Sequence, residues 1–562
     1  MTVSIRSALF FSLSFGIFGQ TSPEASPVLK AMGEELDRNF RILREKADPA
    51  PYFLSYTITE QTADVLSASL GTLTSEHRGT NRYLDTTVRV GSPKLDNYHR
   101  VRGDRAHFTS GAPIAIDDNA FSIQRRMWLE TDRTYRAAAE RLINIRTNKQ
   151  VKVAEEDDSD DFSEEKPSIG VKAVPTHKFA TAEWTARARK LSLEFEKYTE
   201  ILTSQISVLA QTEKKFMASS EGTRLQHGRG FARIMITAHA KAEDGMDLST
   251  SDSFEAVEPG GMPTDAAIRE AITRVAADLK GLLNAPVVDP FVGPAILSGH
   301  ASGVFFHEIF GHRVEGHRQK DESEGQTFTK SVGKPVLPEF LSVIFDPTQR
   351  KIAGVDLNGW YDFDDEGMPA RPVPLIENGV LKTFLMSRSP IRGFDRSNGH
   401  GRRQPGQEIV SRQSNLLVES SRKLPGKGLR DMLLDEIRKQ NKPYGFYIHR
   451  VMGGYTTTSR AGLQAFKVIP LVVYRVYPDG RPDELVRGAD LVGTPLASFA
   501  KIIATSDTVE VFNGYCGAES GNVPVSAASP ALLVREIEIE KKAKSQDRPP
   551  LLPAPAGKES AN

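Results

Sequence analysis

The sequence predicts an α+β fold, in which an N-terminal region of mixed helices and antiparallel sheet precedes a β-rich C-terminal domain. Helical and strand-like patterns both occur over 21–285, whereas strand-like runs separated by Gly, Asp and Asn turns dominate 286–541. The composition, with 39% hydrophobic and 26% charged residues, is that of a globular protein. We therefore expect an N-terminal α+β domain over 21–285 and a C-terminal domain over 286–541.

The N-terminal segment, residues 1–20, has the features of a targeting signal. Arg6 precedes an apolar run from Ala8 to Gly19, which is too short to span a bilayer comfortably. We interpret it as a secretory signal peptide cleaved near Gly19 or Gln20. The protein is then expected to be exported, periplasmic or secreted, without a stable membrane span. If the segment is not a signal, the expected location is cytoplasmic.

The N-terminal domain begins with an amphipathic pattern over 28–46, where apolar residues recur every three or four positions and predict a helix. Strand-like runs then predict an antiparallel sheet. These runs lie at 52–58, 65–70 and 83–90, and the histidines of this part, His77, His99 and His107, are interpreted as surface residues. The other predicted elements are helices over 117–148, 182–198 and 264–283 and a strand over 231–238.

Two segments are expected to lack regular structure. Eight of the eleven residues at 155–165 are Asp or Glu, and because like charges repel we expect a solvated, mobile loop. The charged, proline-rich tail at 542–562 is expected to be disordered.

The densest functional motif lies at 302–317, after an apolar run at 292–297 that predicts a buried strand. Three histidines and two glutamates fall within eleven positions: His307, Glu308, His312, Glu315 and His317. Apolar neighbours such as Phe306 and Ile309 would draw these polar groups inward, where they need partners. A divalent cation is one such partner, and the alternative is a histidine cluster satisfied by other protein groups.

The spacing of His307 and His312 constrains the local backbone. On a regular helix, residues five apart point about 140° away from each other, too far round the axis to bind one small cation. Both imidazoles can reach one metal only if the helix carries a π-type bulge or breaks near Gly311.

The chain has a single cysteine, Cys516, which lies between Gly514 and Gly517. The glycines predict a tight turn that presents the sulfur from a loop. Because catalytic zinc usually takes three protein ligands, this sulfur is a candidate third ligand beside the two imidazoles. The alternative is a buried cysteine that acts as a small hydrophobic residue.

Together these residues resemble the TldD/PmbA metalloproteases, also called modulators of DNA gyrase. The resemblance rests on His307-Glu308-x-x-x-His312, on the Glu315-Gly316 that follows, and on the Cys516-Gly turn with its Val-Pro-Val continuation. Further stretches match in the same order, at Asp364–Gly367, Ile376–Lys382, Asn398–Arg403 and Gly453-Gly454. The resemblance covers 285–540 well and is fainter upstream.

The resemblance implies that His307, His312 and Cys516 are zinc ligands, with one Zn2+ per chain, and that Glu308 is the catalytic carboxylate. It makes 286–541 a metallopeptidase domain that carries the metal-binding helix. It further implies a subunit of the metal-bearing TldD type, which acts on peptides or unfolded protein segments as a homodimer or as a heterodimer with a metal-lacking homologue. Nucleic acid is not an expected partner, because Lys plus Arg and Asp plus Glu both number 72.

The predicted function is therefore a zinc-dependent peptidase. Glu308 would take the proton of the attacking water and deliver it to the leaving amine. Two alternatives remain open: a non-catalytic assembly or regulatory subunit with a structural metal, and a metal-dependent amidase acting on a small or cell-wall peptide.

Several further polar residues have open roles. Glu315 is expected either to orient a ligand or to face solvent. His317, His449 and Tyr455 are weak candidates for stabilising an oxyanion. The Asp364–Gly367 run resembles a metal loop but is interpreted as a β-turn.

Overall fold

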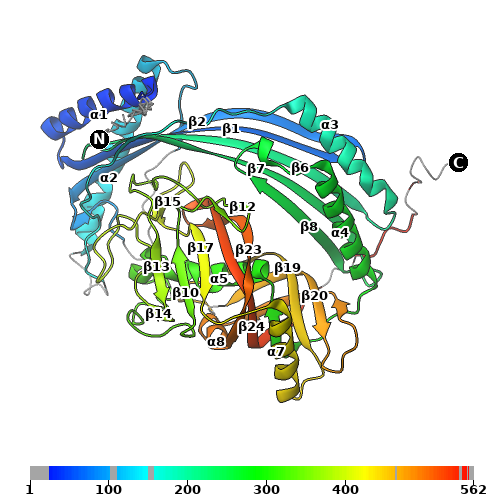
Figure 1. Ribbon diagram of the computed structural model, residues 1–562. Helices are drawn as coiled ribbons and strands as arrows, with labels where there is room; N and C mark the ends of the chain where they lie inside the picture. The colour runs from blue at the N-terminus through cyan, green and yellow to red at the C-terminus, as the bar shows by residue number, and fades with distance from the viewer. Residues whose placement is uncertain are drawn as a thin grey trace, which may run out of the picture.

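The computed structural model describes residues 24–100, 111–149, 157–462, 465–543, 547–552 and 555. The predicted signal peptide, His107, residues 155–156 of the acidic segment and most of the predicted disordered tail lie outside these residues. The α+β prediction is confirmed: a long sheet of the N-terminal region arches over a β-rich C-terminal region (Figure 1). No helix in the described part of the chain is long and apolar enough to cross a membrane.

The arched sheet has eight strands among the described residues, in the order β3-β2-β1-β6-β7-β5, with β4 paired to β2 and β8 to β7. Its strands are β1 Pro51–Ser69, β2 Thr72–Ser92, β3 Leu95–Asp96, β4 Ala112–Pro113, β5 Ile169–Val171, β6 Thr203–Ser219, β7 Arg224–Lys241 and β8 Asp247–Ala256. The strand predicted at 231–238 therefore forms the middle of β7.

The runs at 52–58 and 65–70 are parts of one continuous strand, β1, and not two strands as predicted. The intervening polar residues stay in the sheet because they find partners across it. Glu60 accepts a hydrogen bond of 2.9 Å from Arg82 Nε, and Asp64 Oδ2 lies 2.6 Å from His177 Nε2.

The four predicted helices of this region are confirmed. They are α1 Pro27–Lys46, α2 Ala120–Lys149, α3 Thr181–Ser192 with a 3-10 turn at Leu193–Lys197, and α4 Asp265–Asn284. Side-chain caps fix two of the starts, because Ser26 accepts a hydrogen bond from the Leu29 amide and Thr264 accepts one from the Ala267 amide. In Figure 1, α1 and α2 lie at one end of the arch and α3 and α4 at the other.

The prediction of a solvated acidic loop is wrong at its centre, Asp161–Ser163, whereas Asp158, Asp160 and Glu164 are exposed as expected. Asp161 is buried and its carboxylate lies 2.8 Å from His99 Nδ1, so His99 is not a surface residue either. Phe162 lies between two guanidinium groups, 3.8 Å from that of Arg89 and 3.9 Å from that of Arg388. Cationic and aromatic partners from distant parts of the chain thus outweigh the repulsion within the segment. His77 is exposed, as predicted.

The C-terminal region is built on a sheet of twelve strands among the described residues, in the order β14-β13-β10-β17-β24-β22-β20-β19-β9, with β18, β21 and β23 paired off this path. The strands are β9 Phe291–Leu297, β10 Leu341–Phe345, β13 Val373–Glu377, β14 Val380–Leu381, β17 Asn415–Ser420, β18 Lys423–Leu424, β19 Gly445–Thr456, β20 Phe466–Val476, β21 Glu484–Val486, β22 Ala489–Gly493, β23 Ile502–Ala518 and β24 Gly521–Lys541. Two small hairpins are β11 Lys351–Ile352 with β12 Val355–Asp356, and β15 Gly401–Arg402 with β16 Val410–Ser411.

The longest strand of this sheet, β24, pairs with β23, β17, β22 and β9. The helix α5, Gly299–Ile309, packs against β24, β19 and β23, and its apolar residues Phe305, Phe306 and Ile309 belong to the main core. The other helices of the region are α6 His317–Lys320, α7 Gly426–Lys439 and α8 Pro495–Phe499, and short 3-10 turns lie at Pro259–Gly261 and Gly311–Val314.

The strand β14 is short, because the chain leaves the sheet after Leu381. Leu385 pairs instead with the segment that follows α5: its amide donates to Val314 O at 2.9 Å, and its carbonyl accepts from Gly316 N at 2.8 Å. This contact fixes the chain just beyond the predicted metal motif.

Candidate metal centre

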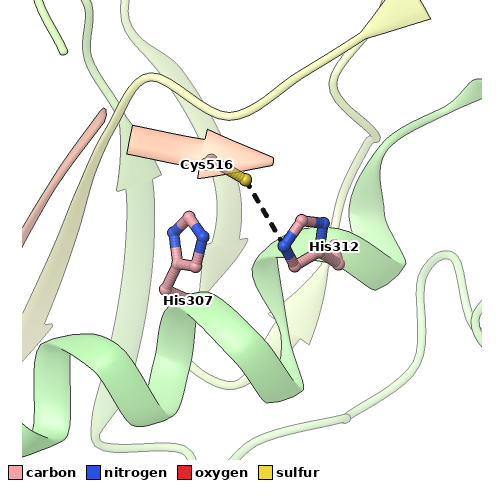
Figure 2. Close-up of side chains that lie close together, drawn as sticks. All are labelled: His307, His312 and Cys516. Atoms are coloured by element: carbon pink, nitrogen blue, oxygen red, sulfur yellow. Dashed lines mark hydrogen bonds between the residues drawn. The ribbon is translucent and has the colours of Figure 1, made fainter. Parts of the chain in front are cut away.

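Three side chains that the sequence predicts as metal ligands lie together: His307, His312 and Cys516 (Figure 2). A nitrogen of each imidazole and the Cys516 sulfur lie within 4.8 Å of one another. The contact between Cys516 Sγ and His312 Nε2 is 3.4 Å, and all three residues are buried. His307 and His312 lie five positions apart in the chain, whereas Cys516 comes from β23.

His312 reaches the same point as His307 because the helix breaks between them. The helix α5 ends at Ile309, and a 3-10 helix begins at Gly311. Of the two alternatives, π-type bulge or break, the structure therefore has the break. The 3-10 turn changes the rotation per residue and brings the second imidazole round toward the first.

Gly311 leaves space at the break for the side chain of Gln413. A Cβ atom added there would lie 1.9 Å from Gln413 Oε1. The same Gln413 donates a hydrogen bond of 3.3 Å from Nε2 to the carbonyl of His307. The glutamine thus supports the end of α5, and glycine at 311 leaves room for its amide group.

Cys516 lies in a strand and not in a loop, which corrects the prediction. It belongs to β23 and pairs with Val523 of β24, two residues before the hairpin turn at 519–520. Its neighbours Val523 and Val525 are buried with it. The glycines predicted a turn of more residues than the structure has. The chain turns only at 519–520, and the residues on either side stay paired in β23 and β24.

Behind His312 lies a network of buried charges. Glu315 is 0% exposed, and its Oε2 accepts hydrogen bonds from His312 Nδ1 at 3.4 Å and from Arg318 Nε at 2.8 Å. A proton held on Nδ1 leaves Nε2 directed toward Cys516. Of the two roles expected for Glu315, the structure has the one that orients a side chain of the cluster, and the solvent-facing alternative is wrong.

Arg412 joins this network to the hairpin that carries the cysteine. Its Nη2 donates to the carbonyl of Cys516 at 2.5 Å, its Nη1 donates to Ser520 Oγ at 2.7 Å, and its Nε lies 3.3 Å from Glu315 Oε1. At the hairpin tip, Glu519 accepts a hydrogen bond of 2.8 Å from Arg318. The guanidinium group of Arg412 therefore fixes the strand that carries Cys516 relative to Glu315, which holds His312.

The protonation states of Cys516 and His312 suit the binding of a cation. Burial opposes ionisation of the Cys516 thiol, but His312, His307 and Arg412 lower its pKa well below the ordinary value. Burial also disfavours the imidazolium of His312, but the Cys516 sulfur and Glu315 raise its pKa to about 10. The donor set is thus a thiolate beside two imidazoles, and the proton on His312 occupies the place that a metal would take.

Glu308 lies on the other side of the cluster. Its Oε2 is 4.0 Å from His312 Nε2, and burial raises the pKa of its carboxyl group. A Cβ atom added to Gly454 would lie 2.7 Å from Glu308 Cγ, so the second glycine of the Gly453-Gly454 pair makes room for this glutamate.

A cavity of about 920 Å³ opens in front of the cluster, and His307 and Glu308 form part of its wall. The rest of the wall comes from both sheets. The contributing segments include 251–255 of β8, 449–454 of β19 and 509–515 of β23. A cavity of this size accommodates a ligand larger than a single amino acid.

Of the weak candidates for oxyanion stabilisation, His449 alone lines this cavity. Its Nδ1 lies 3.2 Å from Tyr447 Oη, and burial lowers its pKa. His317 is hydrogen bonded to Glu519, and Tyr455 is 55% exposed outside the cavity wall.

The Asp364–Gly367 run forms the turn that was predicted. The Gly367 amide donates to Asp364 O at 3.1 Å, and Asp364 Oδ1 accepts from the amides of Glu366 and Met368.

Sequence reasoning did not identify Arg412, Gln413 or Glu519. Glu519 stands within the cysteine motif, so its proximity to Cys516 was a usable signal. Arg412 and Gln413 lie about a hundred residues from either end of the motif, and no local pattern distinguishes them from other polar residues.

Residues 292–541 match the family model of the PmbA/TldA metallopeptidase C-terminal domain. A metalloprotease of Methanocaldococcus jannaschii is 27% identical over 317 residues, which are 56% of this chain and 64% of that protein. A metalloprotease TldD homolog of Haemophilus influenzae is 25% identical over 370 residues, which are 63% of this chain and 69% of that protein. A zinc metalloprotease TldD homolog of Saccharolobus solfataricus is 25% identical over 248 residues, 44% of this chain and 51% of that protein. The chain thus spans less than two thirds of the length of some of these relatives.

Solved structures share the fold over most of the chain. A Thermotoga maritima protein named as a modulator of a DNA gyrase superposes with a TM-score of 0.60 at 16% identity, covering 90% of this chain and 99% of that one. TldE from Thermococcus kodakarensis gives 0.57 at 13% identity, covering 91% and 99%.

Proposed function

Because this chain belongs to the TldD/PmbA family of metallopeptidases, we propose that it is a zinc-dependent peptidase acting on peptides or unfolded protein segments. The observation that carries the proposal is the buried cluster of His307, His312 and Cys516 beside a large cavity, whose wall includes His307 and Glu308.

The residues that would hold the metal are His307, His312 and Cys516. Two imidazoles and a thiolate are a donor set that suits zinc, and a relative named as a zinc metalloprotease supports this choice. When bound, zinc would lower the pKa of water and polarise the carbonyl of the scissile peptide bond.

Glu308 is the proposed general base. A carboxylate in the cavity wall, beside the cluster, can accept the proton of the attacking water on an Oε atom and then give it to the nitrogen of the leaving amine. Its raised pKa suits both steps, because a group with a pKa nearer neutrality gives up a proton as well as accepting one.

The substrate is proposed to bind in extended form. Within the described residues, 450–456 of β19 pair with β20 alone, and 509–518 of β23 pair with β24 alone. The carbonyls of Asn513, Gly514 and Cys516 already accept hydrogen bonds from side chains. Parts of both strands line the cavity, so 450–456 and 509–512 offer backbone edges to a peptide. Backbone pairing of this kind would make cleavage tolerant of the substrate's side chains.

A peptide-library digest tests the proposal. Purified protein loaded with zinc is expected to cleave peptides, a chelator is expected to stop cleavage, and added zinc is expected to restore it. If zinc-loaded protein cleaves no peptide, the metal has a structural role and the proposed peptidase is wrong. If cleavage continues after the metal has been removed, the proposed role of zinc is wrong.

A further inference from the structure

We infer that a second cavity, beside the hairpin that carries Cys516, binds a carboxylate group of the substrate; this inference rests on the proposed peptidase function. The cavity measures about 90 Å³ and lies between strands β6 and β7 and the segments 360–365 and 402–405. We call it the arginine cavity, after Arg229 and Arg402 in its wall.

Arg402 is buried and Arg229 is half-buried, and neither has a carboxylate partner among the described residues. Arg402 is 5% exposed, and its Nη1 donates to the backbone carbonyls of Gln413 and Pro524. Arg229 donates from Nη2 to the side-chain oxygen of Asn358. No carboxylate oxygen of the described residues lies within 4.0 Å of either guanidinium group.

Three of the four acidic residues of the wall are already paired with lysines. Three such ion pairs are Lys215 with Asp365 at 2.7 Å, Lys215 with Glu213 at 3.3 Å, and Lys172 with Asp362 at 2.6 Å. Burial raises the pKa of Asp364, whose carboxylate oxygens accept hydrogen bonds from backbone amides. Glu213 is also the cross-strand neighbour of Arg229, but at a longer range than an ion pair. Lys215 is shared by Glu213 and Asp365, and burial favours the neutral form of Asp364, so the two arginines exceed the remaining carboxylate charge of the arginine cavity by one.

That surplus is unfavourable in the absence of a ligand. Burial lowers the pKa of Arg229 and of Arg402, so the surroundings stabilise neither cation fully. An anion in the cavity would restore the balance, because a buried guanidinium is stabilised by an opposite charge within hydrogen-bonding distance. The planar guanidinium group matches a carboxylate particularly well, since it can donate two parallel hydrogen bonds.

Tyr515 connects this cavity to the metal centre. It lines both the arginine cavity and the 920 Å³ cavity, and it is the residue before Cys516 in β23. A peptide that passes the cluster can therefore direct a carboxylate past Tyr515. The space is enough for such a group with little water and too small for a longer piece of chain, which limits the occupant to a chain terminus or to an Asp or Glu side chain.

Binding measurements with the Glu308→Gln variant, loaded with zinc, test the inference without turnover. The probes are an acetylated alanine-rich peptide with a free terminal carboxylate, the same peptide as an amide, and amidated versions with one internal Glu or Gln. We expect at least about tenfold tighter binding of one carboxylate peptide than of its neutral counterpart. A preference for the free terminus identifies the chain end as the occupant, and a preference for Glu over Gln identifies the side chain.

Adding Arg229→Gln is expected to abolish that preference, and Arg229→Lys to restore part of it. Arg224→Gln is the matched control, because Arg224 lies on the same strand but pairs with Asp37 outside the cavity. Arg402→Gln is less informative alone, since Arg402 also holds the hairpin through Pro524.

The inference is overturned if charged and neutral peptides bind equally, if the preference survives Arg229→Gln, or if that change weakens all four peptides alike. Because the measurement is binding, it separates the two proposals. A preference that depends on Arg229 in a protein that hydrolyses no peptide would contradict the peptidase and leave the carboxylate site intact.

Discussion

Two glutamates on opposite sides of the histidine and cysteine cluster have pKa values shifted in opposite directions, although burial acts on both in the same way. Glu315 has the cations Arg318 and Arg412 and the imidazole of His312 beside it, and although burial opposes its ionisation, these partners lower its pKa to about 2. Glu308 is also buried, but its partners do not compensate, and burial raises its pKa. The partners, and not burial alone, thus decide which carboxylate is fixed and which can exchange a proton.

The same contrast holds for the surroundings of each residue. The side with Glu315, Arg318, Arg412 and Glu519, which we call the closed side, is packed and internally paired. The side with Glu308 faces the 920 Å³ cavity and is the open side. A closed side that holds ligands and an open side that admits substrate should respond differently to mutation.

The largest effect is expected from Glu308→Gln on the open side. The change removes the proposed general base, and peptide hydrolysis should fall by about 10²–10⁴-fold. Zinc content after dialysis should not change, because the three proposed ligands remain. Hydrolysis at the rate of the parent protein would show that Glu308 is not the base.

Glu315→Gln on the closed side is expected to act on the metal first. It removes the charge that orients His312, so zinc affinity should fall by about 10–100-fold in a competition titration with a chromophoric chelator. The change also leaves Arg318 and Arg412 without their shared carboxylate, which should lower the free energy of unfolding by about 3–5 kcal/mol. If zinc affinity is unchanged while stability falls, the closed side supports the fold and not the ligands.

Zinc binding is expected to depend on pH through His312. Its pKa of about 10 means that the metal-free protein carries a proton there at neutral pH, and zinc must displace it. Affinity should therefore rise with pH up to about 10 and fall as the pH is lowered, by about tenfold per unit. Cys516 releases no proton at neutral pH, because its pKa is already low.

Calorimetry in buffers of different ionisation enthalpy measures this release. We expect about one proton per zinc bound at neutral pH. A value near zero would mean that His312 is neutral before the metal binds, and a value near two would mean that Cys516 is a thiol.

The smallest effect is expected at the helix break. Gly311→Ala forces a Cβ atom against Gln413 and should lower the free energy of unfolding by about 1–3 kcal/mol in chemical denaturation. Gly311→Ala combined with Gln413→Ala should recover part of the loss, although the hydrogen bond to the His307 carbonyl is then absent. No recovery would show that the backbone at the break, and not the space beneath Gln413, requires glycine.

Residue spacing alone predicted much of this site. His307 and His312 are five positions apart and cannot both face one metal on a regular helix, so a shared site required the break that the structure has at Gly311. The helices with strong apolar periodicity, such as α4, were likewise predictable almost to their ends. In both cases the information is local.

The wrong predictions share a different cause, which is contact between distant segments. The acidic segment was expected in solvent because Arg89 and Arg388, which contact Phe162, lie far from it along the chain. Cys516 was placed in a loop because glycines dominate its neighbourhood, whereas pairing with β24 holds it in a strand. Arg412 was not identified because its role depends on its contacts with Cys516 and Glu315, which are both about a hundred residues away in the sequence.

The pairing of β24 also bears on how the nascent chain matures. This last long strand pairs with β9, which leads into α5, and with β23, which carries Cys516, while His312 and Cys516 are 204 residues apart in sequence. During synthesis, the histidine-bearing helix leaves the ribosome long before the strand against which it packs. Until Gly521–Lys541 emerges, the apolar face of α5 and the edge of β9 lack this partner and are open to aggregation, so the cluster can assemble only after β24 has been synthesised.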